Sequence, residues 1–377
     1  SGKTGIENVY DQELRGFFGK KIYEVDASGR LLKEIDTIPA IDGKDIHTSL
    51  DLKSQKVAFR ELKNRRGSVV AVDISDGAIV TYLSSPSFSV NKIANGLSQN
   101  DFNELIEDKN KPFFDRAAQG RYSPASTIKP AIGLFGLENN IIDWDFTIDD
   151  PGYFELPEDG RIYRGWKKGG HGKINLQDAI IESSNTFFFS LAYKSEIEEL
   201  IKHLSYFGFG RNVCFDCFLP DNGLLPNPAW KMNTLNFGWF KGDTVNLGVG
   251  QGYMSATPLQ LAYYSAFIAN KGTLNRFSFV QDDRTIPKDV FYSSNIDDSD
   301  WEKIHKSMIG VIEKPKGTAG RLRELKDYII AAKSGTVELV STDTKEDYKI
   351  IREVEGKRDH AIIVAFGPMP NPKYAVS

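Results

Sequence analysis

The chain has 377 residues, of which 40% are hydrophobic and 26% carry a charge, and its formal net charge is −4. This balance is typical of a globular protein with a large core, and it excludes a disordered or fibrous chain. The weakly acidic charge, with no long basic run, argues against a nucleic-acid partner. No apolar segment reaches the ~20 residues that a membrane-spanning helix needs.

The predicted elements form two strand regions on either side of a helical block. Residues 1 to about 45 are charged and dotted with glycine, with short strand-like pieces such as 21–25. The elements that follow are a helix at about 49–62, strands at 68–72 and 79–83, a mostly helical block at 123–313, and strands at 328–340 and 361–367. Strand regions that enclose a helical insert predict an α/β (α+β) sandwich with an antiparallel sheet.

One helix in the block is marked at both ends. Thr257 is a good N-cap, Pro258 suits the first helical position, and a turn at 270–272 closes the helix-compatible run. Gly250 and Gly252, just before it, are interpreted as points of close backbone approach. They do not belong to a strand–glycine-rich–helix nucleotide loop, so we predict no cofactor.

Three short motifs stand in one order along the chain: Ser126-Thr127-Ile128-Lys129, Ser183-Ser184-Asn185 and Lys333-Ser334-Gly335. Together they supply a nucleophile, an amine base, a proton relay and an anchor for an anionic substrate. Each motif alone is a weak signal, and Ser-x-x-Lys recurs at Ser89 to Lys92. Their order and their flanks therefore decide the interpretation.

The flanks favour Ser126 over Ser89. A breaker cluster of Gly120, Ser123 and Pro124 precedes Ser126 and can open a helix. A spacing of three residues then places the serine and its lysine on one helix face. Ser89 follows a Ser-Ser-Pro-Ser stretch and has no comparable helix behind it, so we predict that Ser126 is the nucleophile.

The other two motifs also have informative flanks. The second lies between an amphipathic stretch, 174–181, and a strongly apolar run, 186–192. This pattern predicts a helix, a polar break and a second helix, with Ser183 and Asn185 at the break. The third follows a short apolar run of strand character, so Lys333 and Ser334 are expected at the edge of a cleft.

At this point the sequence resembles the class B penicillin-binding proteins, which are DD-transpeptidases of the serine acyltransferase group that includes the β-lactamases. Within that family it is most similar to the elongation-specific penicillin-binding protein 2 type, and the resemblance covers about residues 5–374. Asp115 departs from the family, which usually has asparagine there. Further segments that carry the likeness are 66–73, 84–88, 150–153, 163–164, 166–168, 170–172, 250–252, 257–262 and 317–319.

The resemblance implies two domains. Residues 1–45 would be the remnant of an N-terminal pedestal, and residues 46–377 the transpeptidase domain. The family carries a membrane anchor, and this chain begins with Ser-Gly rather than Met, so we expect an excised periplasmic part of an inner-membrane-anchored protein. The family would continue beyond residue 377 with another strand and a helix.

The resemblance also assigns catalytic roles. Neutral Lys129 would take the proton of Ser126, which attacks the penultimate D-Ala carbonyl of a peptidoglycan stem peptide. Burial and the positive charge of Lys333 would lower the pKa of Lys129. Ser183 would relay the proton to the leaving amine, and Asn185 would hold Lys129 and the substrate backbone.

The third motif would bind the substrate. The hydroxyl groups of Ser334 and Thr336, on either side of Gly335, would hold the terminal carboxylate in the field of Lys333. Backbone N–H groups of Ser126 and Thr336 would form the oxyanion hole. D-Ala would leave, and an amine from a neighbouring stem would complete the cross-link. β-Lactams would mimic the donor and trap the acyl-enzyme.

The implied partners are stem peptides that end in D-Ala-D-Ala, β-lactams, the membrane glycosyltransferase RodA and the scaffold MreC. Three other functions stay open. The protein could be a β-lactamase or DD-carboxypeptidase, in which water replaces the acceptor amine. It could be a non-catalytic β-lactam receptor, or a scaffold whose main role is protein contact. The complete motif set argues against a pure scaffold.

The two cysteines give a weaker functional signal than the three motifs. Cys214 and Cys217 form a Cys-x-x-Cys pattern, which occurs in metal half-sites and redox pairs. No other cysteine is present and a thioredoxin-like context is missing, so a local disulfide is also open.

Some relatives of the penicillin-binding protein 2 type carry zinc bound by two Asp, one His and one Cys. Asp150 and His171 stand at two of those places. Gly165 stands where the second Asp would be, and Ser184 where the Cys would be. Because glycine and serine cannot replace these ligands, we predict no metal.

Overall fold

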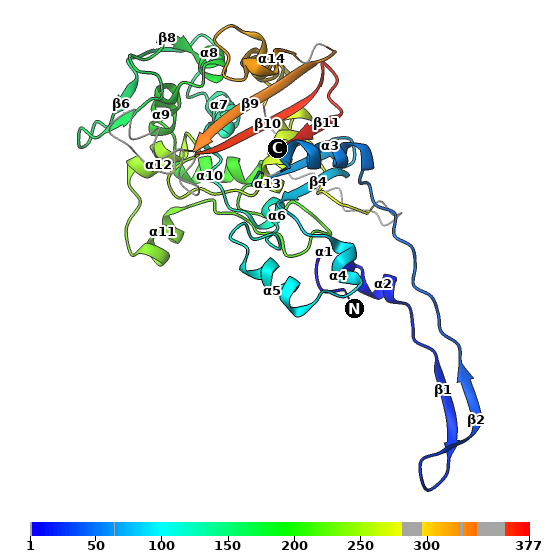
Figure 1. Cartoon of the computed structure of the whole chain (residues 1–377). Helices are drawn as coiled ribbons and strands as arrows, with labels where there is room; N and C mark the ends of the chain where they lie inside the picture. Colours follow the sequence, from blue (N-terminus) through cyan, green and yellow to red (C-terminus); the bar gives the residue numbers. More distant parts are fainter. Residues whose placement is uncertain (1, 64, 281–295, 325–326, 338–358) are drawn as a thin grey trace.

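The computed structural model of the chain describes residues 2–63, 65–280, 296–324, 327–337 and 359–377. Its centre is a five-stranded antiparallel sheet in the order β4-β3-β11-β10-β9 (Figure 1). The strands are β3 (Gly67–Asp73), β4 (Ile79–Ser85), β9 (Ile329–Val337), β10 (His360–Met369) and β11 (Tyr374–Val376). The predicted fold class is therefore confirmed. Residues 338–340 of the expected third strand lie outside the described residues.

Alternating burial along β4 shows that one face of the sheet is covered. In β4 the residues Ile79, Thr81, Leu83 and Ser85 are buried, and those between them are half-buried. This period of two is what a strand with one packed face produces. The edge strand β9 pairs with β10, and this register places Lys333 opposite Val364.

The helices with the most extensive contacts with the sheet lie on three of its parts. These are α3 (Leu52–Leu62) on β4, α13 (Pro258–Ala269) on β3, β10 and β11, and α14 (Asp298–Glu313) on β9. As predicted, Thr257 caps α13. Its Oγ1 accepts from the Gln260 N–H, and the Gln260 side chain accepts from the Thr257 N–H. Every residue of α13 is buried, so this helix lies at the centre of the core.

The region between β4 and β9 is mostly helical, as predicted, but it also holds two small antiparallel sheets, β5 with β8 and β6 with β7. The strands are β5 (Thr147–Asp150), β6 (Tyr153–Glu155), β7 (Ile162–Arg164) and β8 (Gly172–Asn175). The helices are α4 (Val90–Ala94), α5 (Gln99–Glu107), α6 (Arg116–Gln119), η1 (Ala125–Ile128, a 3₁₀ turn), α7 (Lys129–Glu138), α8 (Leu176–Ile181), α9 (Asn185–Tyr193), α10 (Ile197–Tyr206), α11 (Pro228–Leu235), α12 (Lys241–Leu247) and the 3₁₀ turn η2 (Gly320–Glu324).

One expected helix was too long. The amphipathic stretch that begins at Ile174 predicts a helix from its first residue. Instead Ile174 belongs to β8, and Asn175 is the N-cap of α8, where its side chain accepts from the Asp178 N–H at 3.0 Å. Asparagine prefers this capping position to a helix interior, because its side chain competes for backbone hydrogen bonds.

The N-terminal segment forms two short helices and a hairpin that extends away from the rest of the molecule (Figure 1). The elements are α1 (Gly5–Val9), α2 (Asp11–Arg15), β1 (Lys20–Val25) and β2 (Leu31–Ile38). Every residue of the two strands is exposed. The predicted strand at 21–25 is thus present. Tyr10 anchors the segment, because it is buried and its hydroxyl donates to Asp216 Oδ2 at 2.8 Å.

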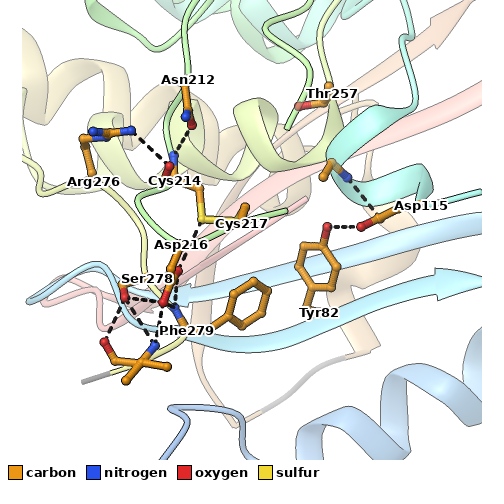
Figure 2. Close-up of a disulfide and its surroundings, with 12 residues drawn as sticks. Tyr82, Asp115, Asn212, Cys214, Asp216, Cys217, Thr257, Arg276, Ser278 and Phe279 are labelled. Atoms are coloured by element: carbon orange, nitrogen blue, oxygen red, sulfur yellow. Dashed lines mark hydrogen bonds between the residues drawn. A yellow bond between two sulfur atoms is a disulfide. The ribbon is translucent and has the colours of Figure 1, made fainter. Parts of the chain in front are cut away.

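Cys214 and Cys217 form a disulfide beside this contact (Figure 2). Because the two sulfurs are bonded to each other, neither is a thiolate ligand. The loop that they close presents the buried carboxylate of Asp216, which accepts from the Ser278 hydroxyl and from the backbone N–H of Phe279, at 2.9 Å each. Of the alternatives left open by the sequence, the structure has the local disulfide, and this loop joins the N-terminal segment to the domain core.

Candidate active site

The first motif lies at the junction of η1 and α7. Ser126 is half-buried in η1, and Lys129 is the first residue of α7 and has no exposed surface. Gly250 supports this turn from outside, because its carbonyl accepts from the Ala125 N–H at 2.9 Å. A Cβ at Gly250 would lie 2.4 Å from the Ala125 carbonyl oxygen, so only glycine fits. The predicted close backbone approach is confirmed for this glycine.

The second motif contacts Lys129 through the break between α8 and α9. Lys129 Nζ lies 2.8 Å from the Ser183 carbonyl oxygen, 2.7 Å from Asn185 Oδ1 and 3.2 Å from Ser183 Oγ. Ser183 has a left-handed backbone with φ of 58°, which non-glycine residues rarely adopt. The sequence of helix, polar break and apolar helix is as predicted, and the break turns Ser183 towards the lysine.

Ser184 holds the break between α8 and α9 in place through two hydrogen bonds. Its hydroxyl caps α9 by accepting from the Phe187 N–H at 3.2 Å, and it donates to Asp150 Oδ2 at 2.7 Å. Asp150 is also 2.6 Å from His171 Nδ1. A Cβ at Gly165 would lie 3.6 Å from Oγ1 of Thr186, which is two residues after Ser184. Asp150, His171 and Ser184 stand at three of the places where some relatives have zinc ligands. Here they are joined by hydrogen bonds to the Asp150 carboxylate.

The third motif brings a second lysine to the same serine. Lys333, on β9, is fully buried and donates to Ser183 Oγ at 3.0 Å and to the Ser334 carbonyl at 3.0 Å. Gly335 lets β9 approach η1, because a Cβ there would lie 3.0 Å from the Pro124 carbonyl oxygen. Thr336 follows on the strand and is exposed.

The environment favours a neutral amine at Lys129. Burial is the largest cause of its lowered pKa, the charge of Lys333 lowers it further, and Asp150 opposes both. Burial also lowers the pKa of Lys333, to about 7. A neutral amine has two N–H donors and one lone pair. The Ser183 carbonyl and Asn185 Oδ1 can only accept, so they engage both donors and leave the lone pair free to take a proton.

The predicted residues are brought together to different degrees. Lys129, Ser183, Asn185 and Lys333 are joined by direct hydrogen bonds. Ser126 is placed beside them by η1, and within the described residues no hydrogen bond engages its hydroxyl. Such catalytic contacts are often loose before substrate binds.

The competing motif at Ser89 lies apart from this cluster. Ser89 is exposed and caps the short exposed helix α4, where its Oγ accepts from the Lys92 N–H at 3.4 Å. As expected, no comparable helix follows Ser89, because α4 has five residues and none of them is buried, whereas α7 has ten residues and is mostly buried. Serine is a preferred N-cap, which explains the pattern without catalysis.

Two residues near the cluster were not assigned a role from the sequence. Thr318 Oγ1 lies 2.7 Å from Ser334 Oγ. The indole N–H of Trp166 donates to the Ser183 carbonyl at 3.1 Å. Both lie in segments that carry the family resemblance, but spacing along the chain cannot show that loops 16 or 17 residues away return to the motifs.

Comparisons with known proteins agree with this geometry. Residues 67–377 match the penicillin binding protein transpeptidase domain, and residues 1–48 match the penicillin-binding protein dimerisation domain. The peptidoglycan D,D-transpeptidase MrdA of Acinetobacter baumannii is 38% identical to the chain over 383 residues. The match covers all of this chain and 56% of that protein, so the chain spans somewhat over half of this curated relative.

Two solved structures resemble the whole chain. The structure of Pseudomonas aeruginosa PBP2 in complex with WCK 5153 has a TM-score of 0.83 and 35% identity, and 78% of its chain is covered. The complex between PBP2 and MreC from Helicobacter pylori has a TM-score of 0.85 and 32% identity, with 67% of that chain covered. None of the helices in the described parts of our chain combines the length and apolar character that crossing a bilayer requires. With a family model over most of its length and relatives of this similarity, the chain belongs to the penicillin-binding protein transpeptidase family.

Proposed function

We propose that this protein is a peptidoglycan DD-transpeptidase that works through an acyl-serine intermediate during cell-wall elongation. The observation that carries the proposal is the position of Ser183 Oγ between two lysine amines, 3.2 Å from Lys129 Nζ and 3.0 Å from Lys333 Nζ. A hydroxyl that contacts two buried amines of lowered pKa can pass a proton between them and a bound substrate.

Acylation proceeds by proton transfer and attack. Lys129 Nζ takes the proton of Ser126, and Ser126 Oγ bonds to the carbonyl carbon of the penultimate D-Ala. The backbone N–H groups of Ser126 and Thr336 stabilise the oxyanion. As the C–N bond breaks, Lys129 returns the proton through Ser183 to the nitrogen of the leaving D-Ala. The product is an ester at Ser126.

Cross-linking reverses these roles. The acceptor amine of a neighbouring stem bonds to the ester carbon and gives its proton to Lys129, and Ser126 recovers a proton as the C–O bond breaks. Before D-Ala leaves, its terminal carboxylate is held by the Ser334 and Thr336 hydroxyl groups, with the charge of Lys333 close by. The Thr318 contact orients Ser334 for this task. A β-lactam enters as a donor analogue and leaves a blocked Ser126.

The hydrolase alternative receives less support. A β-lactamase needs a base directed at a deacylating water, and the acidic cluster of Glu196, Glu198 and Glu199 is exposed on and before α10. Asn185 Oδ1 accepts one N–H of Lys129, so this buried lysine has a polar neighbour where lysine-dependent hydrolases have an apolar residue. The ester at Ser126 is therefore expected to react with an acceptor amine rather than with water.

The assembly is proposed from the relatives. Helicobacter pylori PBP2 forms a complex with MreC, and our chain resembles that PBP2 over its full length. We propose that this protein works on the periplasmic side of the inner membrane with an MreC-type scaffold and a RodA-type glycosyltransferase. A pull-down of the scaffold by the protein tests the first contact, with deletion of the exposed hairpin 20–38 as the comparison.

The enzymatic proposal is tested with a D-Ala-D-Ala stem peptide and an amine acceptor. Release of D-Ala with formation of a cross-linked product supports transpeptidation. Release without cross-linking at any acceptor concentration indicates a carboxypeptidase, and acylation by β-lactam without any peptide turnover indicates a receptor.

A further inference from the structure

Trp166 is an exposed aromatic residue that hydrogen-bonds to the backbone of Ser183 in the candidate active site. It lies in the loop between β7 and β8, and 59% of its surface is exposed. Yet its indole N–H donates to the carbonyl of Ser183 at 3.1 Å. A large exposed side chain gains little from packing here, so this directed contact is its main interaction with the site.

The Ser183 carbonyl receives two donors. Lys129 Nζ lies 2.8 Å from it and the Trp166 indole nitrogen 3.1 Å, so both lone pairs of the oxygen are engaged. Ser183 is held at a φ of 58°, a backbone state that persists only where its surroundings fix it. The indole contact is one of the interactions that fix it, and the same residue carries the hydroxyl between the two lysines.

The loop that carries Trp166 is itself supported. The N–H of Gly165 donates to the Gly152 carbonyl at 2.7 Å, and a Cβ at Gly165 would lie 3.1 Å from that oxygen. The other edge of the indole meets the His171 ring, with centroids 5.8 Å apart and planes at 65°. His171 bonds to Asp150, which also holds Ser184. The indole is therefore placed by the same carboxylate that supports the break after α8.

We propose that Trp166 is a positioning residue, whose indole N–H fixes the Ser183 carbonyl and thereby aims the amine of Lys129 and the hydroxyl of Ser183 at the reacting serine. Without this donor the carbonyl turns more fully to Lys129 and binds its ammonium form more strongly. The lysine then spends less time as a correctly placed neutral base. This role rests on the proposed acyl-serine mechanism.

The charged groups around Lys129 set the background for this effect. Lys333 approaches from β9 and Asp150 from β5, while α9 contributes the neutral Asn185 and the ring of Phe188, whose centroid is 5.5 Å from Nζ. Close to Trp166, Lys167 is paired with Glu182 at 3.5 Å. None of these groups is altered by a change confined to the indole nitrogen.

The test removes that one donor. Replacing Trp166 with 3-benzothienylalanine keeps the shape of the side chain and exchanges N–H for sulfur, and Trp166→Phe is the simpler variant. The rate of acylation and the dissociation constant of the non-covalent complex are measured separately with benzylpenicillin. We expect the acylation rate to fall roughly three- to tenfold, the range that one neutral hydrogen bond supplies, while the dissociation constant stays unchanged. The rising limb of the rate against pH should move to higher pH.

Trp239→Phe is the matched control, because the indole of Trp239 donates to Thr244 Oγ1 at 2.8 Å, and no hydrogen bond joins it to the motifs in the part of the chain that the structure describes. It should acylate like the wild type. An unchanged acylation rate in the benzothienylalanine variant, or a loss confined to the dissociation constant, overturns the role of Trp166. If the wild-type protein is not acylated, the proposed function itself fails, so the two failures are distinguishable.

Discussion

Lys333 Nζ lies 3.0 Å from Ser183 Oγ, although 150 residues separate them in the sequence. The contact joins the edge strand of the sheet to the break between α8 and α9, and Lys129 reaches the same hydroxyl from α7. Substrate anchor, proton relay and base are thus parts of one hydrogen-bonded group. Removing the Ser183 hydroxyl should therefore take a hydrogen-bond partner from each of the two buried lysine amines.

Lys129→Ala should lower the rate of acylation by a β-lactam by about 10²–10⁴, because proton transfer to a positioned base contributes that much. Non-covalent affinity should change little, since Lys129 has no surface exposed to a ligand. Stopped-flow acylation separates the two quantities. Lys92→Ala, in the competing Ser-x-x-Lys pattern, should behave like the wild type. A folded Lys129→Ala protein that acylates at the wild-type rate contradicts the assigned role.

The pH dependence should reflect Lys333. Burial lowers the pKa of Lys333 to about 7. Its cationic form attracts a substrate carboxylate, so this attraction is full below that pH and is lost as the pH rises through it. Lys129 acts in the opposite direction, because its neutral form accumulates as the pH rises.

We therefore expect the second-order rate constant for acylation by a β-lactam carboxylate to decline above a pH of about 7. The methyl ester of the same compound lacks the charge and should not show this decline. Rates measured for both compounds from pH 5 to 9 decide the matter, roughly the range over which such groups titrate. The same falling limb for both compounds would exclude charge attraction by Lys333.

The contact of Tyr10 with Asp216 should contribute to stability. Asp216 is buried and accepts from two hydroxyls, those of Tyr10 and Ser278, and from the backbone N–H groups of Phe279 and Val280. Asp216→Asn should lower the free energy of unfolding by about 2–4 kcal/mol, because hydrogen bonds to a buried charge are replaced by weaker ones. Chemical denaturation measures this loss.

Asp26→Asn is the comparison for that experiment. Asp26 also accepts from backbone N–H groups, those of Ser28 and Arg30, but it lies in the exposed hairpin. Its replacement should cost much less. Equal losses in the two variants would show that burial beneath the disulfide loop adds nothing.

Much of the fold could be predicted because local chemistry agrees with the final structure. Thr257 has the cap, the proline and the capping partner of a helix start, and α13 begins there. The two flanking regions contain short apolar runs of strand character, which is enough to predict the sheet. Ile174 was misassigned because a short run with one buried residue fits both a strand end and a helix start.

The three motifs could be predicted because each is continuous in sequence. Trp166 and Thr318 could not be assigned roles, since their contacts with Ser183 and Ser334 depend on how separate loops return to the same place. The disulfide was open for a different reason. Two cysteines at this spacing can bind metal, exchange electrons or pair, and only the conformation of the loop distinguishes these outcomes.

The metal prediction stays a prediction. Asp150 and His171 are hydrogen-bonded to each other. Ser184 and Gly165 stand where some relatives have the other two zinc ligands. We expect elemental analysis of the purified protein to find no stoichiometric zinc, because neither serine nor glycine supplies a thiolate or carboxylate. A tetrahedral ion bound at Asp150 and His171 would contradict this.

We expect Ser126 to form a long-lived acyl-enzyme, because the acidic cluster of Glu196, Glu198 and Glu199 is exposed to solvent and does not supply a base for a deacylating water. Intact mass after mixing with benzylpenicillin, followed over time and combined with peptide mapping, tests it most directly. We expect one adduct on Ser126 that persists for at least many minutes in neutral buffer and is absent in Ser126→Ala. Labelling of Ser89, labelling that survives Ser126→Ala, or decay of the adduct within seconds would contradict it.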